Sequence, residues 1–236
     1  MEERFSRMQL LVGAEGMARL QSASVAVFGV GGVGSYAVEA LARAGVGKLM
    51  LVDFDQVCHS NINRQIHALE STVGQPKVEV MAARCRAINP AIEVIAINRC
   101  YNSEHSRSLL AGPFDYVLDC IDDISAKLHL LESCYRQELP IISSMGAANK
   151  LDPSLVQVAD LAKTKKCRLA RILRKELRKR DIERGIKVVF STEEFRPLAH
   201  ADGERKPLLG SSSYLPPIFG LTMAGEVIQT LLGDMD

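Results

Sequence analysis

Val25-Ala-Val-Phe-Gly29 runs directly into Gly29-Val-Gly-Gly-Val-Gly34, and this stretch decides the fold. The apolar run predicts a buried strand, and the glycines predict a tight turn that opens a helix. Gly29, Gly31 and Gly34 fit the dinucleotide-binding fingerprint, in which the backbone comes close to a phosphate, and Gly32 lies in the same turn. The flanking strand and helix make a chance glycine turn the weaker explanation. We therefore predict a nucleotide phosphate site here.

Strand and helix signals alternate from the first strand to residue 144, as is typical of an α/β fold. Short apolar runs predict further strands at 49–52, 93–97, 116–119 and 141–144. Because right-handed crossovers are nearly obligatory, this alternation predicts a doubly wound, mostly parallel sheet with helices on both faces. Ligands bind such sheets outside the carboxyl ends of the strands, where the winding reverses. The glycine turn and Asp119-Cys-Ile-Asp122 end the first and fourth strands, so we expect them to face one crevice.

Polar residues follow the predicted strands at this edge. Asp53 ends the second strand, where a carboxylate suits a ribose, and Asp122 lies just past the fourth strand, where it would contact Mg²⁺. We expect Asp119 to bind backbone amides instead, and Asp123 to cap the following helix. Asn61-Ile-Asn-Arg-Gln65 offers a planar guanidinium and side-chain amides to phosphate oxygens.

Lys77 lies in the first turn of a helix that Pro76 begins. The helix macrodipole disfavours a cation there by about a few tenths of a kcal/mol or more, so the position indicates an anionic ligand. The alternative is a solvated surface lysine. With Arg64, Lys77 indicates a phosphate more highly charged than the pyrophosphate of a redox dinucleotide, as in an enzyme that uses ATP.

The composition is that of an ordinary globular protein, with 236 residues, 47% hydrophobic and 24% charged. Its six cysteines form no Cys-x-x-Cys pair and its five histidines no His-x-His arrangement, so we expect no zinc site. The start shows no signal peptide, and the apolar stretch Ile218 to Leu232 is shorter than the roughly 20 residues of a membrane span. We expect a core helix there, no membrane contact and a cytoplasmic location.

Charge is strongly segregated along the chain. Twelve Lys or Arg and three acidic residues give a balance of +9 between Lys163 and Lys187, although the net charge of the chain is +1. We expect a basic helix in this region, with Leu169, Ile172, Leu173 and Leu177 on its apolar side. Like charges at i,i+4 destabilise such a helix unless a polyanion binds it, so we predict an RNA partner. The alternatives are a solvated helix or one that lies on a membrane surface.

The segment beyond Leu151 departs from the alternation. Two further strands are expected at 155–158 and 188–191, antiparallel to each other, and Ala201 to Pro217 is expected to be a mobile loop.

The predicted RNA-binding side chains lie away from the apolar side of the basic helix. They are Arg171, Arg174, Lys175, Arg178 and Lys179.

These motifs together resemble the adenylating superfamily of ubiquitin-activating-type enzymes, which includes the thiamine and molybdopterin adenylyltransferases. The resemblance rests on Gly29-x-Gly-Gly-Val-Gly34, Asp53-x-Asp55, Asn61-x-Asn-Arg-Gln65, Gly74-Gln-Pro-Lys77 and Asp119-Cys-Ile-Asp122. It implies a homodimer that activates a carboxylate with ATP and Mg²⁺. It also implies that Arg7, from Arg4-Phe-Ser-Arg7, acts across the interface beside Arg64, Lys77 and the metal ligand Asp122. The implied nucleotide-binding set is Gly29, Gly31, Gly32, Gly34, Asp53, Asp55, Asn61, Asn63, Arg64, Gln65 and Lys77.

The later part of the chain resembles one branch of this superfamily, the tRNA threonylcarbamoyladenosine dehydratases. The resembling stretches are Asp152-Pro, 156–164, 169–171, 177–182 and 188–193. This implies ATP-dependent cyclisation of the modified adenosine beside the anticodon through an acyl-adenylate, without zinc. The implied organisation is a helical arm at 1–23, an ATP-binding part at 24–150 and a substrate- and tRNA-binding extension of the same domain at 151–236.

Three other functions stay open at this point. A protein that adenylates a sulfur carrier or ubiquitin-like protein would need a thiol such as Cys167, among Lys165, Lys166 and Arg168, and a sulfur-delivery protein would then be a partner. Branch members often have Asp-Pro at 167–168, so we interpret Cys167 as incidental. An NAD-dependent oxidoreductase would leave Lys77 without a role, and an RNA-binding module would explain only the basic helix.

Overall fold

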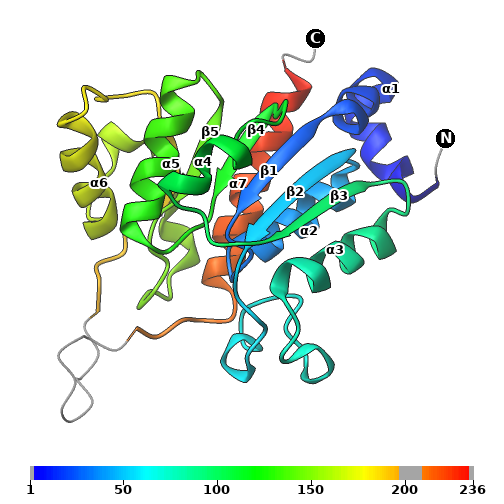
Figure 1. The fold of residues 1–236 in the computed structure, drawn as a ribbon, viewed down its shortest axis with the longest axis horizontal. Helices are drawn as coiled ribbons and strands as arrows, with labels where there is room; N and C mark the ends of the chain where they lie inside the picture. Colours follow the sequence, from blue (N-terminus) through cyan, green and yellow to red (C-terminus); the bar gives the residue numbers. More distant parts are fainter. Residues whose placement is uncertain (1–2, 197–208, 234–236) are drawn as a thin grey trace.

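The structure, a computed structural model, describes residues 3–196 and 209–233. Within these residues, seven strands form one sheet in the order β3-β2-β1-β4-β5-β7-β6 (Figure 1). Every neighbouring pair is parallel except β6 and β7. The strands are β1 (Ser24–Phe28), β2 (Lys48–Asp53), β3 (Glu93–Asn98), β4 (Tyr116–Asp119), β5 (Ile141–Ser144), β6 (Val156–Asp160) and β7 (Lys187–Ser191).

The winding of the sheet reverses at β1, as predicted. Val25 is in register with Leu49 of β2 on one side and with Tyr116 of β4 on the other. The two strands expected after Leu151 are antiparallel to each other, and β7 also extends the parallel sheet by pairing with β5. The doubly wound α/β architecture is therefore confirmed, with a single antiparallel strand at one edge of the described sheet.

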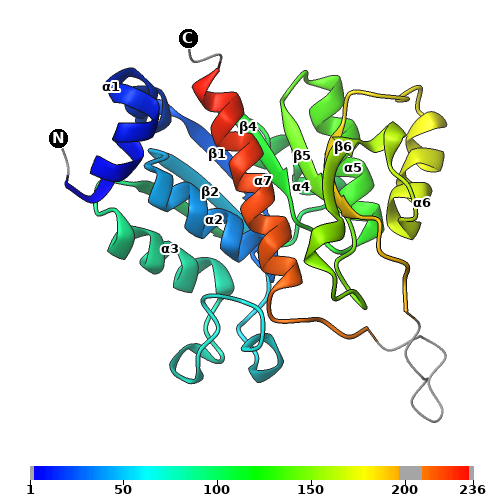
Figure 2. The same ribbon diagram turned by 180° about the vertical axis from the view of Figure 1, so that it is seen from behind.

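Helices cover both faces of the sheet, because alternate residues of each strand point to opposite sides. Val25 and Val27 pack with α2, α3 and α7 on one face (Figure 2), whereas Ala26 and Phe28 pack with α4, α5 and α6 on the other (Figure 1). The described helices are α1 (Ser6–Ser22), α2 (Gly34–Ala44), α3 (Lys77–Ile88), α4 (Ser103–Leu109), α5 (Ile124–Arg136), α6 (Arg168–Arg178) and α7 (Leu215–Leu232).

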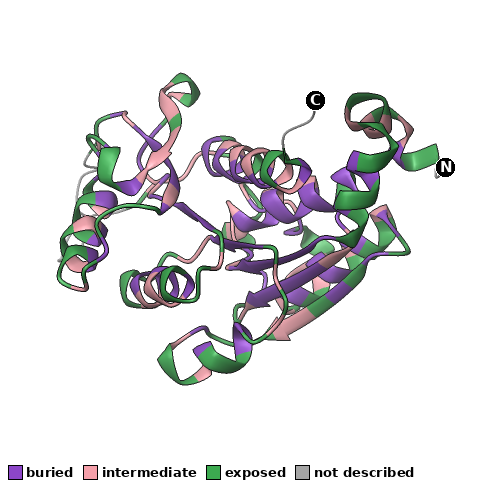
Figure 3. Cartoon of the chain, turned by 90° about the horizontal axis from the view of Figure 1, so that it is seen from above, coloured by how far each residue is buried: buried purple, intermediate pink, exposed green. Residues whose placement is uncertain are grey.

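The central strands are buried, and exposure increases towards the loops and the outer helix surfaces (Figure 3). Short 3-10 turns interrupt the connections. They lie at Glu3–Phe5, His59–Asn61, Glu70–Thr72, Pro153–Leu155 and Leu161–Lys163. The helical arm expected at the start is α1, which packs against α7 and is kinked at Gly13.

The last helix, α7, is long and apolar enough to cross a membrane, but half of its residues are buried inside this fold. It packs along α2 so closely that a Cβ at Gly220 would lie 2.1 Å from the Val33 carbonyl oxygen. The expected core helix is therefore confirmed. The expected loop at 201–217 was too long, because Leu215 to Pro217 form the first turn of α7, where proline is favoured. Residues 201–208 of that expected loop lie outside the described residues.

Candidate active site

The glycine turn and the end of β4 meet at one edge of the sheet. Gly29 has a φ of +87°, and a Cβ there would lie 2.7 Å from the Cys120 carbonyl oxygen. A Cβ at Gly34, the first residue of α2, would lie 1.9 Å from the Gly29 carbonyl oxygen. Only glycine fits at these two positions, so the turn brings the amides that open α2 next to the segment that holds Asp122.

The loop at 61–65 packs over the glycine turn. A Cβ at Gly32 would lie 3.4 Å from Cγ of Arg64, and a Cβ at Gly31 would lie 3.7 Å from Nε2 of Gln65. Arg64 donates through Nη1 to the Ser60 carbonyl and to Oδ1 of Asn63. The polar loop and the glycine turn, 30 residues apart in the sequence, thus form one surface.

Gln65 is 5% exposed, and its Oε1 has no hydrogen-bond partner among the described residues. A buried amide oxygen without a partner is unfavourable by about 1–3 kcal/mol. Because this side chain lies against Gly31, a ligand with a donor group at the turn would relieve that penalty.

Asp53 braces the glycine turn from the end of β2. Its Oδ2 accepts a hydrogen bond of 2.6 Å from the Val30 amide, and its Oδ1 accepts one of 2.9 Å from the Asp55 amide. Burial raises the pKa of Asp53, although the two amides oppose that shift. The residue predicted to hold a ribose therefore also has a structural role in shaping the turn.

Lys77 is the first residue of α3, as predicted, but it is not a solvated surface lysine. It is 5% exposed, and its Nζ lies 2.7 Å from Oδ2 of Asp55. Its amide also donates to the Asp55 carbonyl oxygen. The bridge between Gln56 and Pro76 holds the two segments together. The structure thus places a buried ammonium at the carboxyl edge of β2.

The three aspartates after β4 have different environments. Asp119 is fully buried and binds the Ile121 amide, whereas Asp123 caps α5 through the Ala126 amide, both as expected. Asp122, between them, is exposed and has no hydrogen bond or ion pair among those the structure describes. The described residues contain no cluster of three His, Cys, Asp or Glu suited to a metal. A cation at Asp122 would therefore need ligand oxygens to complete its coordination.

Two buried residues beneath this edge were missed from the sequence. Lys127 is fully buried, and its Nζ binds Oδ2 of Asp119 at 2.7 Å and Oγ of Ser143 at 3.2 Å. Its position among the buried residues of α5 at helical spacing, with Leu130, Leu131 and Cys134, was the signal that could have identified it.

The second of these residues is His67, which is 2% exposed. Neither of its ring nitrogens has a partner among the described residues. Burial, and then the charges of Lys77 and Arg84, lower its pKa to about 4. No sequence pattern distinguishes this histidine from a surface histidine.

The basic helix is α6, with Leu173 and Leu177 buried and Arg171, Lys175 and Arg178 exposed. Lys179 follows the helix and pairs with Glu176 at 2.8 Å.

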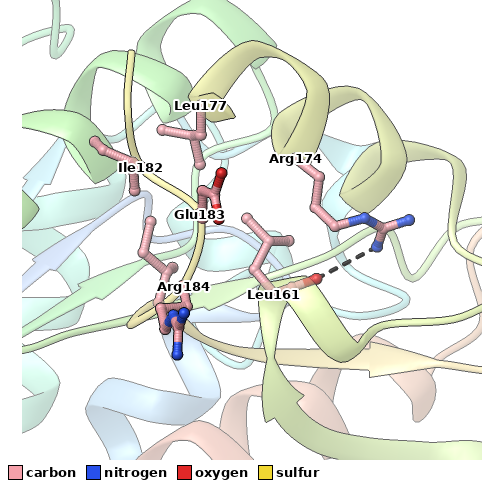
Figure 4. A pocket seen from close by; sticks show the side chains of 7 residues that line it. Leu161, Arg174, Leu177, Ile182, Glu183 and Arg184 are labelled. Atoms are coloured by element: carbon pink, nitrogen blue, oxygen red, sulfur yellow. Dashed lines mark hydrogen bonds between the residues drawn. The ribbon is translucent and has the colours of Figure 1, made fainter. Parts of the chain in front are cut away.

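Two expectations for α6 were wrong. Ile172 is 40% exposed, because its direction falls between the apolar side and the basic side. Arg174 turns inwards and donates to the carbonyl oxygens of Leu161 and Thr164. The Arg174 side chain lines a small pocket together with Leu161, Leu177 and Ile182 (Figure 4). Arg174 therefore does not belong to the outward-facing basic set.

Cys167 is buried and serves as the N-cap of α6, where its sulfur accepts a hydrogen bond from the Ala170 amide. This contact accounts for the residue without a catalytic role. Cys58 and Cys100 are the exposed thiols among the described cysteines, all of which are free.

Comparison with known proteins gives one consistent result. The model of the ThiF family matches residues 5–236. The tRNA threonylcarbamoyladenosine dehydratase of Bacillus subtilis is 45% identical, over 100% of this chain and 97% of its own length. The crystal structures of the Escherichia coli tRNA N6-threonylcarbamoyladenosine dehydratase in complex with AMP and with ATP are 35% identical, with TM-scores of 0.90 and 0.88. Each match covers 97% of this chain, and covers 94% and 93% of the respective crystallised chain.

Proposed function

The chain belongs to the ThiF family, and we propose that it is an ATP-dependent tRNA threonylcarbamoyladenosine dehydratase. The observation that carries this conclusion is the extent of the similarity to the Bacillus subtilis enzyme. The similarity includes the part of the chain after residue 150, with α6 and the β6–β7 pair, and is not confined to the glycine turn. The Escherichia coli enzyme in complex with ATP shares the whole fold, which supports ATP as the nucleotide.

The reaction follows from the chemistry of the substrate. The threonyl carboxylate attacks the α-phosphorus of ATP, which forms an acyl-adenylate and releases pyrophosphate. The carbamoyl group of the same substituent then attacks the activated carbonyl, closes a ring and expels AMP. One carboxylate oxygen leaves with AMP, so the nucleoside loses the equivalent of one water. Both nucleophiles belong to the substrate, so no protein thiol is required.

The residues at the glycine turn fit the first step, in which catalysis consists mainly of positioning and charge neutralisation. The amides at the start of α2 would bind phosphate oxygens, and Asp53 holds that turn in place. Lys77 and Arg64 would neutralise the negative charge that develops on the phosphates. Asp122 would hold Mg²⁺, which in phosphate sites takes one or two carboxylates and completes its coordination with substrate oxygens.

The basic side of α6 would bind the tRNA backbone. Arg171, Lys175 and Arg178 are exposed on the helix, and Lys179 directly follows it. Phosphate contacts of this kind supply affinity without reading sequence. Arg174 is left out of this surface, because its guanidinium is bound to backbone carbonyls.

A second copy of the chain would complete the site with Arg7. Leu10 and Leu11 of α1 are 78% and 77% exposed, close in sequence to Arg7, which is itself exposed. Two large apolar side chains in water on the same helix support an interface at the arm. We propose a homodimer in which each Arg7 reaches the partner's phosphate site, and a cytoplasmic location, where a tRNA-modifying enzyme meets its substrate.

The proposal is tested with ATP, Mg²⁺ and tRNA that carries threonylcarbamoyladenosine. The expected products are AMP, pyrophosphate and a nucleoside lighter by one water, with no AMP from tRNA that lacks the modification. Cys167→Ser should keep this activity, because serine is also a good N-cap. AMP formation that requires a small carrier protein and the thiol of Cys167 or Cys58 would instead support an activator with a sulfur-delivery partner.

A further inference from the structure

The segment Leu209–Tyr214 leads into α7 across the carboxyl edge of the sheet and is held at several points. The Gly210 amide donates to Oδ1 of Asn149, and the Asn149 amide donates to the Gly210 carbonyl. Nδ2 of Asn63, in the loop over the glycine turn, donates to the Ser211 carbonyl at 3.0 Å. This segment therefore connects the nucleotide-binding loop with the chain that follows β5.

Tyr214 is the exposed aromatic residue of this segment, with 41% of its surface accessible. Its hydroxyl donates a hydrogen bond of 2.7 Å to the Leu151 carbonyl. Leu151 is itself fixed, because its amide binds the carboxylate of Glu193, which is 5% exposed. The ring of Tyr214 is thus held in one place before any ligand arrives.

The position of Tyr214 is close to the reacting centre. Two residues further on, a Cβ at Gly32 would lie 3.1 Å from Cβ of Pro216, so the start of α7 touches the glycine turn. Asp53, at the end of β2, lies on one side of β1, whereas Leu151 follows β5 on the other side. Tyr214 therefore lies across the phosphate site from the strand that would hold the ribose of ATP.

From this geometry we propose that the ring of Tyr214 stacks on the purine of the substrate nucleoside. This stacking would hold the threonyl carboxylate of the substrate at the phosphate site. The inference rests on the dehydratase function proposed above. In that substrate the reacting carboxylate is attached to the purine through a short substituent, so the ring must lie beside the phosphate site. Unstacked RNA bases commonly stack on aromatic side chains, and every base can do so because each has a flat aromatic face.

The other exposed aromatic side chains among the described residues fit this role less well. Phe54 directly follows Asp53, on the side of β2 where ATP would lie. Tyr135 is 40% exposed near the end of α5, and its ring lies 3.3 Å from where a Cβ of Gly185 would be. Since α5 starts at the carboxyl edge and rises about 1.5 Å per residue, Tyr135 is more than about 15 Å from that edge. It is a matched control.

The test compares Tyr214→Leu, Tyr214→Phe and Tyr135→Leu. For each, KM for modified tRNA is measured in the AMP-release assay, and Kd for ATP is measured without tRNA. We expect Tyr214→Leu to raise KM for tRNA about tenfold or more, as for loss of a stacked base. Tyr214→Phe keeps the ring and should stay within about twofold, and Tyr135→Leu should match the wild type. Kd for ATP should be unchanged in all three, which also shows that the site is folded.

Three results would overturn the assignment. An unchanged KM for tRNA in Tyr214→Leu would mean that the ring contacts no base. A rise in Kd for ATP would mean that Tyr214 serves the nucleotide. Equal loss in Tyr214→Phe and Tyr214→Leu would mean that only the bond to Leu151 matters. A wild-type protein that cyclises no tRNA would contradict the proposed function itself, and so is distinguished from failure of this inference.

Discussion

Nζ of Lys77 and Oδ2 of Asp55 lie 2.7 Å apart in an ion pair in which only the carboxylate is exposed to solvent. The Lys77 side chain is 6% exposed, whereas that of Asp55 is 48% exposed. The ammonium is therefore enclosed by the protein, whereas the carboxylate is accessible to solvent and to a ligand. A phosphate that replaces Asp55 would meet a cation that is already positioned, so little ordering entropy would be lost on binding.

Replacement of this ammonium should abolish most of the chemistry. We expect Lys77→Ala to lower the rate of AMP formation by about two to three orders of magnitude, as for loss of one charge-stabilising donor. Lys77→Arg should recover only part of the rate, because the two cations differ in shape and hydrogen-bond geometry. The control is Lys48→Ala, which removes the ion pair with Glu93 at the opposite end of β2. Wild-type AMP formation in Lys77→Ala would remove the residue from the site.

Asp122 and Asp123 are adjacent and should respond differently to substitution. Asp122→Asn should raise the Mg²⁺ concentration needed for half-maximal AMP formation, because the exposed carboxylate is the proposed metal ligand. Asp123→Ala should leave that concentration unchanged and lower the free energy of unfolding by about 1 kcal/mol, since it removes the N-cap of α5. Titration of activity with Mg²⁺ and urea unfolding separate the two effects. Equal Mg²⁺ dependence of AMP formation in the wild type and in both variants would contradict the assignment of Asp122 as the metal ligand.

The expectations that the sequence supported well were those fixed by local chemistry. The strand before Gly29 and the first turn at Lys77 were predicted correctly, because backbone preference and turn geometry depend on neighbouring residues. The direction of the Arg174 side chain was predicted wrongly, because its carbonyl partners come from the turn that follows β6. Helical spacing could have placed Lys127 on the buried face of α5, but not its partners. Asp119 and Ser143 come from β4 and β5, which spacing alone does not place beside it.

The basic side of α6 can be tested by the salt dependence of tRNA binding. Each phosphate contact contributes about 0.7–0.9 to the slope of log K against log salt concentration. Arg171→Ala with Arg178→Ala should therefore lower that slope by about 1.5 if both bind phosphates. Arg174→Ala should leave the slope unchanged and destabilise the fold by about 1–3 kcal/mol, since it removes the donor to the Thr164 carbonyl. A double variant with the wild-type slope would exclude this face of α6 from the interface.

His67 should make the fold sensitive to mild acid. Its pKa is lowered to about 4 by burial first and then by Lys77 and Arg84, whereas the unfolded chain has the ordinary value of 6.5. Below pH 6.5 the unfolded state therefore binds a proton that the native state refuses, and stability falls until the pH reaches about 4. Between pH 7 and pH 5 this contributes a loss of about 2 kcal/mol. Urea unfolding should show that loss in the wild type and a correspondingly flatter pH profile in His67→Gln. If the free energy of unfolding fell equally with pH in the wild type and in His67→Gln, His67 would not be the source of the acid sensitivity.

Mixing two inactive variants tests whether Arg7 acts in the partner's site. Arg7→Ala and Lys77→Ala should each lack activity as homodimers, because every site then misses one cation. In a mixed dimer, one site combines the intact Lys77 of the first chain with the intact Arg7 of the second, and the other site misses both. Random exchange of subunits makes half of the dimers mixed, so activity should recover to about a quarter of the wild-type level. If Arg7 acts within its own chain, each site of the mixed dimer still misses one cation and the mixture stays inactive. Arg4→Ala mixed with Lys77→Ala is the control for general effects of altering the arm.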